Sequence, residues 1–313
     1  MATILPTVTM KSDKPAPIVA SFSSRGPIPG IDSLLKPDVA APGVTILAAW
    51  PTFVTNDTIV GRQPPEFAFL SGTSMACPHV AALAAMVKSR DPTWGPSAIR
   101  SAVMTTKNRN SLGSPITTLT GSRASPYDIG AGEISISGHI QPGLVYETET
   151  QDYVKFLCDN GYDSAKIGLI APDVACPVSN KSSSSVSEMN YPLVSISNLH
   201  ENEVRTVTRT VTNVGDEDES IYEADIEAPA GVEVRVVPAQ LRFTESIRKL
   251  RFQVAFKLTS DVKSRREDVL FGTIAWKGVD LKVRSPFVVT VNNNVTSSGC
   301  AAAGPSFLFL FMV

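Results

Sequence analysis

The sequence predicts an α/β segment followed by an all-β sandwich. Up to about residue 145, helical runs lie beside short, continuously apolar segments, which is typical of an α/β domain. After Tyr191, apolar and polar residues alternate with a period of two, which is typical of half-buried strands. The chain has 313 residues, of which 43% are hydrophobic and 19% charged, so it can form two domains with buried cores.

Three runs in the first part indicate regular structure. Residues 44–50 follow a Pro-Gly pair and predict a buried strand. Residues 78–88 are apolar nearly all round, which predicts a helix inside the domain rather than on its surface. Residues 96–105 predict a second helix, because Pro96 suits the first turn and apolar residues recur three and four positions after Ile99.

The second part consists of short strands and turns. The segments that alternate apolar and polar residues are 222–226, 232–236, 250–256 and 279–283. The turn signals between them are at 213–215, 229–231 and 277–278. About seven short strands in roughly 100 residues predict a β-sandwich.

The change of pattern also sets the expected domain organisation. The first part covers residues 1–145, and a connecting region with a short helix at 152–157 covers residues 146–189. The sandwich covers residues 190–291, and residues 292–313 form a tail.

Composition and charge exclude several classes of protein. The net charge is −2, with no run of Lys and Arg, so a nucleic-acid partner is not expected. No stretch reaches the roughly 18 apolar residues of a membrane span, and no basic start precedes an apolar run as in a signal peptide. Without a Cys-x-x-Cys pair or a calcium-loop spacing, we expect neither metal nor cofactor. The acidic residues 216–219 are interpreted as a solvated hairpin turn.

The cysteines and the glycosylation sequons bear on whether the chain enters a secretory compartment. Cys158 and Cys176 lie 18 residues apart around a loop and can close one disulfide, whereas Cys77 in its Ala-rich run is interpreted as a buried free thiol. The sequence has three Asn-x-Ser/Thr sequons, which either arise by chance or mark glycosylation in a secretory route. The candidate asparagines are Asn56, Asn180 and Asn294.

Ser74, near the start of the Ala-rich helix, has two interpretations. A nucleophilic hydroxyl needs exposure, a nearby base and donors for the oxyanion that it creates. Gly72 leaves room for a substrate backbone, and a helix start offers unpaired N–H groups and a partial positive charge. A serine at a helix start is also a common N-cap, so the residue types alone leave both interpretations open.

The motif Gly72-Thr73-Ser74-Met75-Ala76 resembles the nucleophile motif of the subtilases, the subtilisin-like serine proteases. Segments that resemble the plant branch of that family are 22–27, 35–43, 99–106, 130–132 and 142–146. The β region is similar to the fibronectin type III-like C-terminal domain of that branch through 207–215 and 283–286. The resemblance implies a partial subtilase catalytic domain over 1–145, with the end of a protease-associated insert at its start, and a fibronectin type III-like domain over 190–291.

The resemblance implies a serine-type endopeptidase in which Ser74 attacks a peptide carbonyl, a His takes its proton and an Asp orients that His. In the subtilisin order the Asp and the His precede the Ser. The histidines of this chain all follow Ser74, and they are His79, His139 and His200. The aspartates that match no triad position are Asp13, Asp32 and Asp38. We interpret His79 and Asp38 as structural and expect the triad Asp and His to lie before Met1, leaving this chain inactive alone.

The family also implies surroundings and partners. The branch places a disulfide where Cys158 and Cys176 lie, the full-length member is extracellular in the apoplast or cell wall, and its substrates are peptides or proteins. We expect residues 1–140 to expose apolar helix faces and to be only marginally folded alone, while 190–291 is stable. The alternative is a non-catalytic binding or decoy module built on the β-sandwich.

Overall fold

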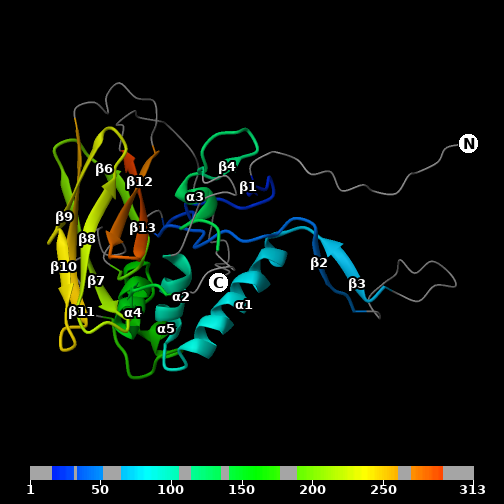
Figure 1. The fold of residues 1–313 in the computed structure, drawn as a ribbon, viewed down its shortest axis with the longest axis horizontal. Coiled ribbons are helices and arrows are strands. Elements are labelled where there is room, and N and C mark those ends of the chain that lie inside the picture. The colour runs from blue at the N-terminus through cyan, green and yellow to red at the C-terminus, as the bar shows by residue number, and fades with distance from the viewer. Residues whose placement is uncertain are drawn as a thin grey trace, which may run out of the picture.

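The computed structural model describes residues 16–31, 34–51, 65–105, 114–134, 141–176, 189–259 and 269–291. They form a β-sandwich, with helices and short strands of the first part against one side of it (Figure 1). A β-hairpin projects from the far end of helix α1, away from the sandwich. The architecture confirms the expected α/β segment followed by an all-β sandwich.

The sandwich has two sheets. A five-stranded sheet has the order β10-β8-β12-β13-β6, and a four-stranded sheet has the order β5-β7-β11-β9. Strand β6 runs parallel to β13, and the other neighbours in the two sheets are antiparallel. The strands are β5 Leu144–Val145, β6 Val194–Leu199, β7 Val204–Asn213, β8 Ser220–Glu227, β9 Val232–Val237, β10 Gln240–Phe243, β11 Lys249–Leu258, β12 Val269–Lys277 and β13 Lys282–Val291.

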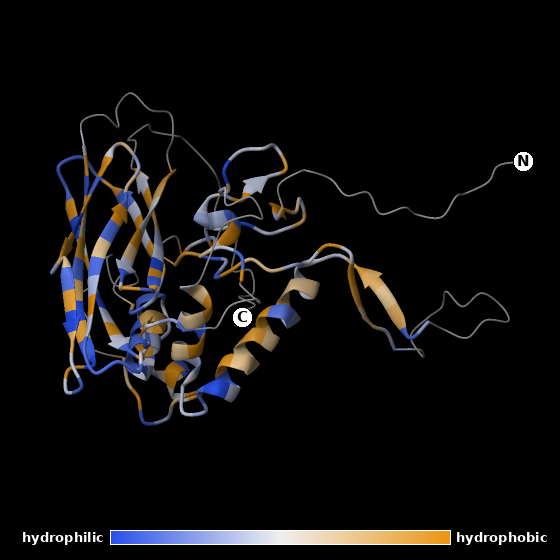
Figure 2. Cartoon of the chain, in the orientation of Figure 1, coloured by the Kyte–Doolittle hydropathy of each residue, from blue (hydrophilic) through white to orange (hydrophobic). Residues whose placement is uncertain are grey.

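The period-two pattern predicted three of these strands in place and the start of a fourth. Figure 2 shows hydrophilic and hydrophobic residues alternating along them. The predicted segments 222–226, 232–236 and 250–256 lie within β8, β9 and β11. The segment 279–283 was wrong in its first half, because Val279 is 95% exposed in the turn between β12 and β13. Residues 216–219 are exposed as predicted, but they are not a hairpin, since they connect β7 to β8 in the opposite sheet.

Aromatic residues fill the space between the sheets. Phe252 contacts Trp276 edge to face with ring centroids 5.0 Å apart, and Tyr146 approaches Phe252 at 6.5 Å. Leu144 and Tyr146 belong to the same buried cluster, although they lie before the segment 190–291 that was expected to form the sandwich. Burial of large rings in this edge-to-face geometry is a major source of stability for such a core.

The connecting region contains two helices, α4 Thr150–Asp159 and α5 Ser164–Gly168. Helix α4 confirms the helix predicted at 152–157 and begins two residues earlier, where Glu149 and Asp152 form a capping box. The Cys158–Cys176 disulfide joins the end of α4 to the segment after α5. The spacing of the two cysteines alone had allowed a disulfide without requiring one, and the structure contains the bond.

The first part holds α1 Thr73–Arg90, α2 Pro96–Met104, α3 Pro126–Ile129, β1 Ile18–Val19, β2 Ile46–Ala49, β3 Phe67–Leu70 and β4 Thr117–Thr118. Strand β1 pairs with β4 in parallel, and β2 pairs with β3 as an antiparallel hairpin. Helix α2 confirms the prediction for 96–105, with Pro96 at its first position.

Two burial predictions for the first part were wrong. The strand predicted at 44–50 is β2, but Leu47 and its cross-strand partner Phe69 are 56% and 66% exposed. The helix predicted to lie inside the domain is α1, in which Leu83 and Val87 are buried while Met86 is 56% exposed. The reason is that Leu83 and Val87 of α1 pack in a buried cluster with α2 and Ile134, whereas Met86 does not belong to that cluster. The expected exposure of apolar helix faces is thereby confirmed, as the hydrophobic residues on α1 and the hairpin in Figure 2 illustrate.

Candidate active site

Ser74 is the second residue of α1, and its side chain is exposed. The N-cap of the helix is Gly72, which has no side chain to accept a hydrogen bond. The N-cap interpretation of Ser74 is therefore wrong. Within the described part of the chain the Ser74 hydroxyl makes no hydrogen bond, so it is free to meet an incoming molecule.

The backbone around Ser74 offers hydrogen-bond donors. The N–H groups of Met75 and Ala76 donate to the Gly72 carbonyl at 3.0 and 3.4 Å. The N–H groups of Thr73 and Ser74 find no acceptor among the described residues, as is usual for the first turn of a helix. These two groups and the positive end of the helix dipole favour an anion or an oxyanion beside Ser74.

The turn before α1 is held by the segment that precedes β2. The Gly72 N–H donates to the Gly43 carbonyl at 2.8 Å, and the Thr45 N–H donates to Ser71 Oγ at 2.8 Å. Thr45 has φ 54°, a left-handed conformation that is strained for a β-branched residue. A Cβ on Gly43 would lie 2.8 Å from the Gly72 carbonyl oxygen, so glycine is what allows the two backbones to approach.

The described residues bring no imidazole to Ser74. His79 Nδ1 donates to the Met75 carbonyl at 2.8 Å within the same helix, which agrees with a structural role. Pro78 has no N–H, so the Ser74 carbonyl lacks the donor that a regular helix would supply. His200 is exposed after β6 on the sandwich, and His139 lies outside the described residues. Cys77 is free but half-buried, so its interpretation as a buried thiol was wrong in degree.

Asp38 lies apart from Ser74 in a buried cluster. Its carboxylate is 5% exposed, lies 2.6 Å from Lys36 Nζ and accepts a hydrogen bond from the Tyr191 hydroxyl. Burial, followed by the neighbouring Asp38 charge, raises the pKa of Tyr191 well above its usual range, so the phenol remains a donor. This environment agrees with the structural role expected for Asp38, whereas Asp13 and Asp32 lie outside the described residues.

Sequence reasoning missed Tyr191 and Arg100. The Arg100 guanidinium lies 4.7 Å from the centroid of the Tyr191 ring, and its Nη2 donates to Thr148 Oγ1 at 3.1 Å. Both residues lay in segments already noticed, but nothing in their spacing shows that they meet across 91 positions of the chain.

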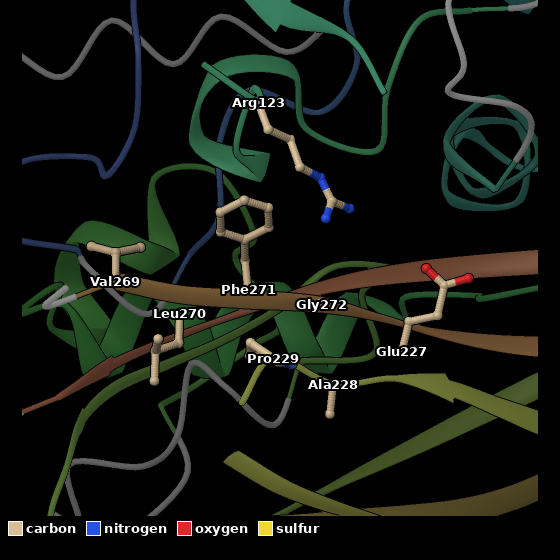
Figure 3. A pocket seen from close by; sticks show the side chains of 8 residues that line it. All are labelled: Arg123, Glu227, Ala228, Pro229, Val269, Leu270, Phe271 and Gly272. Atoms are coloured by element: carbon tan, nitrogen blue, oxygen red, sulfur yellow. The ribbon is translucent and has the colours of Figure 1, made fainter. Parts of the chain in front are cut away.

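A shallow cavity of about 250 Å³ lies elsewhere, where the loop before α3 faces the ends of β8 and β12 (Figure 3). The Arg123 guanidinium lies 5.4 Å from the Phe271 ring centroid, and Glu227 is on the opposite side of the opening. None of the residues that line this cavity comes from the start of α1. It is therefore separate from the candidate nucleophile.

Three further findings concern sites and membranes. In the described ranges no three His, Cys, Asp or Glu side chains are grouped so that they can hold a metal ion. No helix of that part is both long enough and apolar enough to cross a bilayer. The sequon residues lie outside the described residues, and they are Asn56, Asn180 and Asn294.

Comparison with known proteins gives two family matches. The Subtilase family matches residues 7–132, and the Fibronectin type-III domain matches residues 188–289. The first match contains Ser74 and α1, and the second contains the sandwich strands from β6 to β12 and most of β13.

Individual relatives match nearly the whole chain. The CO(2)-response secreted protease of Arabidopsis thaliana is 46% identical over 302 residues, covering 95% of this chain and 39% of the relative. Subtilisin-like protease SBT5.1 of the same plant is 47% identical over 300 residues, with coverages of 93% and 38%. Subtilisin-like serine-protease S of Lotus japonicus is 39% identical over 297 residues, with coverages of 93% and 37%.

The chain thus spans about two fifths of the length of these relatives. The chain is a relative of the plant subtilisin-like proteases, with a subtilase segment over residues 7–132 followed by a fibronectin type III domain over residues 188–289.

Proposed function

We propose that Ser74 is the nucleophile of a subtilase-type serine endopeptidase site. The observation that carries the proposal is its exposed hydroxyl at the second position of α1, beside two N–H groups without acceptors in the described part. Gly72 adds support, because it presents no side chain where a substrate backbone approaches. The match of the Subtilase family to residues 7–132 supports the same assignment.

The proposed reaction is acyl transfer from a peptide or protein substrate. Ser74 Oγ bonds to the carbonyl carbon while its proton passes to an imidazole, and the carbonyl oxygen becomes an oxyanion. The unpaired N–H groups of the first helical turn donate to that oxyanion. The C–N bond then breaks, the amine leaves with the proton, and water hydrolyses the acyl-enzyme.

We propose that the base is supplied from outside the described residues and that the chain by itself is inactive. His79 uses Nδ1 within its own helix, His200 follows a sandwich strand, and His139, which lies outside the described residues, has no role in the proposed site. In subtilisin, loss of the catalytic His alone lowers kcat by about 10⁶-fold. That factor corresponds to about 8 kcal/mol of lost transition-state stabilisation.

A chimera tests the role of Ser74. The region of Subtilisin-like protease SBT5.1 that matches this chain is replaced by residues 1–291, and hydrolysis of a peptide substrate is measured. We expect activity in the chimera, its loss in the Ser74→Ala variant, and its retention in Ser89→Ala, which changes an exposed serine of the same helix. Hydrolysis that survives Ser74→Ala would refute the assignment.

A fluorophosphonate probe tests the state of the isolated chain. We expect Ser74 to be labelled no faster than Ser89, because neither hydroxyl has a base among the described residues. Rapid labelling that is confined to Ser74 would show that the chain carries its own base.

We also propose an extracellular location. The Cys158–Cys176 disulfide suits an oxidising compartment, and one relative is described as a secreted protease. The proposed glycosylation sites are Asn56, Asn180 and Asn294. Expression through a secretory route, followed by glycosidase treatment, should lower the mass of the chain; an unchanged mass would remove the glycosylation proposal.

The proposed division is 1–145 for the catalytic segment, whose last strand β5 joins a sheet of the sandwich, 146–189 for the connection, 190–291 for the fibronectin type III-like domain and 292–313 for the tail. The family matches at 7–132 and 188–289 support the main boundary. A second candidate function is a non-catalytic binding or decoy module built on the sandwich. It is favoured by the lack of an imidazole at Ser74 among the described residues, and the chimera distinguishes the two, since a decoy yields no active hybrid.

A further inference from the structure

Tyr191 is the meeting point of three segments that are far apart in the sequence. Its side chain is 4% exposed, and its hydroxyl donates to the Asp38 carboxylate. Lys36 Nζ lies 3.2 Å from the same hydroxyl, and the Arg100 guanidinium lies 4.7 Å from the ring centroid. The segment that leads into the sandwich thereby contacts both the loop before residue 40 and helix α2.

The surroundings of this cluster are apolar and closely packed. Tyr191 belongs to a buried group that joins Leu35, Met104 and Tyr127 of the first part to Val288 of β13. A carboxylate buried among such residues is stable when it is paired and hydrogen-bonded, and Asp38 has both kinds of partner. The cluster therefore fixes the position of Asp38 relative to the sandwich.

Backbone hydrogen bonds hold the segment that leads from Asp38 to the turn before Ser74 at Asp38, at Ala40 and at Gly43. The Ala131 N–H donates to the Asp38 carbonyl at 2.8 Å, and the Ala40 N–H donates to the Gly132 carbonyl at 2.9 Å. Residues 38–40 are thus held along residues 131–134, and three residues after Ala40 the Gly43 carbonyl accepts the Gly72 N–H at 2.8 Å.

Two of the segments that resemble the plant branch of the family lie beside Tyr191. Residues 35–43 contain Asp38 and Gly43, and residues 99–106 contain Arg100. Asp38 and Arg100 contact Tyr191, and Gly43 accepts a hydrogen bond from the Gly72 N–H.

We propose that Tyr191 is a positioning residue for the Ser74 turn, acting through Asp38 and the segment 38–43. The proposal rests on the assignment of Ser74 as the nucleophile. The sandwich thereby determines where the start of α1 lies, although it contributes no group to the reaction.

Amide hydrogen exchange of the full chain tests this inference without any need for activity. In Tyr191→Phe the ring remains beside Arg100, but the buried Asp38 carboxylate loses one donor. We expect exchange at the amides of Ala40 and Gly72 to accelerate by about 10- to 100-fold, the effect of one hydrogen bond to a charged group. Amides of β7 and β11 should be unchanged.

The matched control is Tyr146→Phe, which removes another buried tyrosine hydroxyl, 2.8 Å from Ser285 Oγ. This variant should leave exchange at Gly72 unchanged. The inference is overturned if Tyr191→Phe leaves the Gly72 amide unaffected, or if both variants accelerate it equally. If Ser74 is not the nucleophile, the chimera will show it through hydrolysis that survives Ser74→Ala, whereas the amide exchange rates do not depend on that assignment.

The unmodified chain provides a second measurement should Tyr191→Phe fail to fold. Exchange is followed at increasing urea concentrations for the amides of Ala40, Gly72 and Tyr191, all of which have acceptors. We expect these three amides to open in one cooperative unit. Loss of protection at Ala40 and Gly72 while Tyr191 stays protected would overturn the inference.

Discussion

Replacing Gly43 by alanine places a methyl group against the turn that leads to Ser74. The new Cβ lies 2.8 Å from the Gly72 carbonyl oxygen and 3.3 Å from Ala76 Cβ. Close carbon–oxygen contacts in proteins lie at about 3.3–3.6 Å, so the Gly72 carbonyl has to move by roughly 0.5 Å. The same two residues share the 2.8 Å hydrogen bond from the Gly72 N–H to the Gly43 carbonyl, which limits how far they can separate.

Overpacking of this kind costs about 1–3 kcal/mol, and we expect Gly43→Ala to destabilise the chain within that range. The displacement also bears on reactivity, because a misplacement of about 1 Å can lower a rate by about 10²-fold. For half that movement we expect kcat/KM of the chimera to fall by about tenfold. Both effects have one cause, which is the contact between two backbones.

Urea denaturation of the full chain measures the first effect, and peptide hydrolysis by the chimera measures the second. Gly168→Ala is the control, because a Cβ at Gly168 meets nothing within 4 Å and its stability should change by less than about 0.5 kcal/mol. The reasoning is refuted if Gly43→Ala and Gly168→Ala have the same urea midpoint and the same rate.

Three further predictions concern the strained turn, the core and the surface of the sandwich. Thr45→Gly releases about 1–2 kcal/mol of left-handed strain against about 0.5–1 kcal/mol of backbone entropy, so its thermal midpoint should rise slightly, and Thr45→Ala should show less gain. Phe252→Ala empties the space beside the buried Trp276 and should lose about 3–5 kcal/mol in urea denaturation followed by tryptophan fluorescence; an unchanged midpoint would contradict the packing. Hydrogen bonds from two lysines lower the pKa of Asp225, so this group stabilises the fold above its unfolded pKa and loses that contribution as the pH falls through the folded pKa. In Asp225→Asn the free energy of unfolding should therefore fall less between about pH 5 and pH 2 than in the unmodified chain. If the two proteins lose the same stability over this range, Asp225 does not contribute to it.

The sandwich strands were predictable because their signal is local. A strand such as β11 buries every second residue, and that alternation is visible without knowledge of its neighbours. The same rule failed at Val279, since the alternation continues through the four-residue turn 278–281, where no sheet face exists. It also could not show that β7 and β8 enter opposite sheets, because partner choice depends on distant segments.

The candidate site was predictable to a smaller degree. The residue types around Ser74 indicated either a nucleophile or a cap, and the position of Gly72 as N-cap excluded the second interpretation. The contact between Tyr191 and Asp38 spans 153 positions and has no local signal. Burial of β2 was wrong for a related reason: an apolar run shows that a surface can be covered, not which segment covers it.

Strand β5 has a practical consequence for anyone who shortens this polypeptide. Leu144 is fully buried and Tyr146 is 1% exposed, and both fill the interior of a domain whose remaining strands begin fifty residues later, at Val194. A recombinant fragment that starts at residue 190 would lose two side chains from its interior and expose an edge of β7. One that starts at residue 141 keeps both, so the earlier start should give the more soluble and more heat-resistant product.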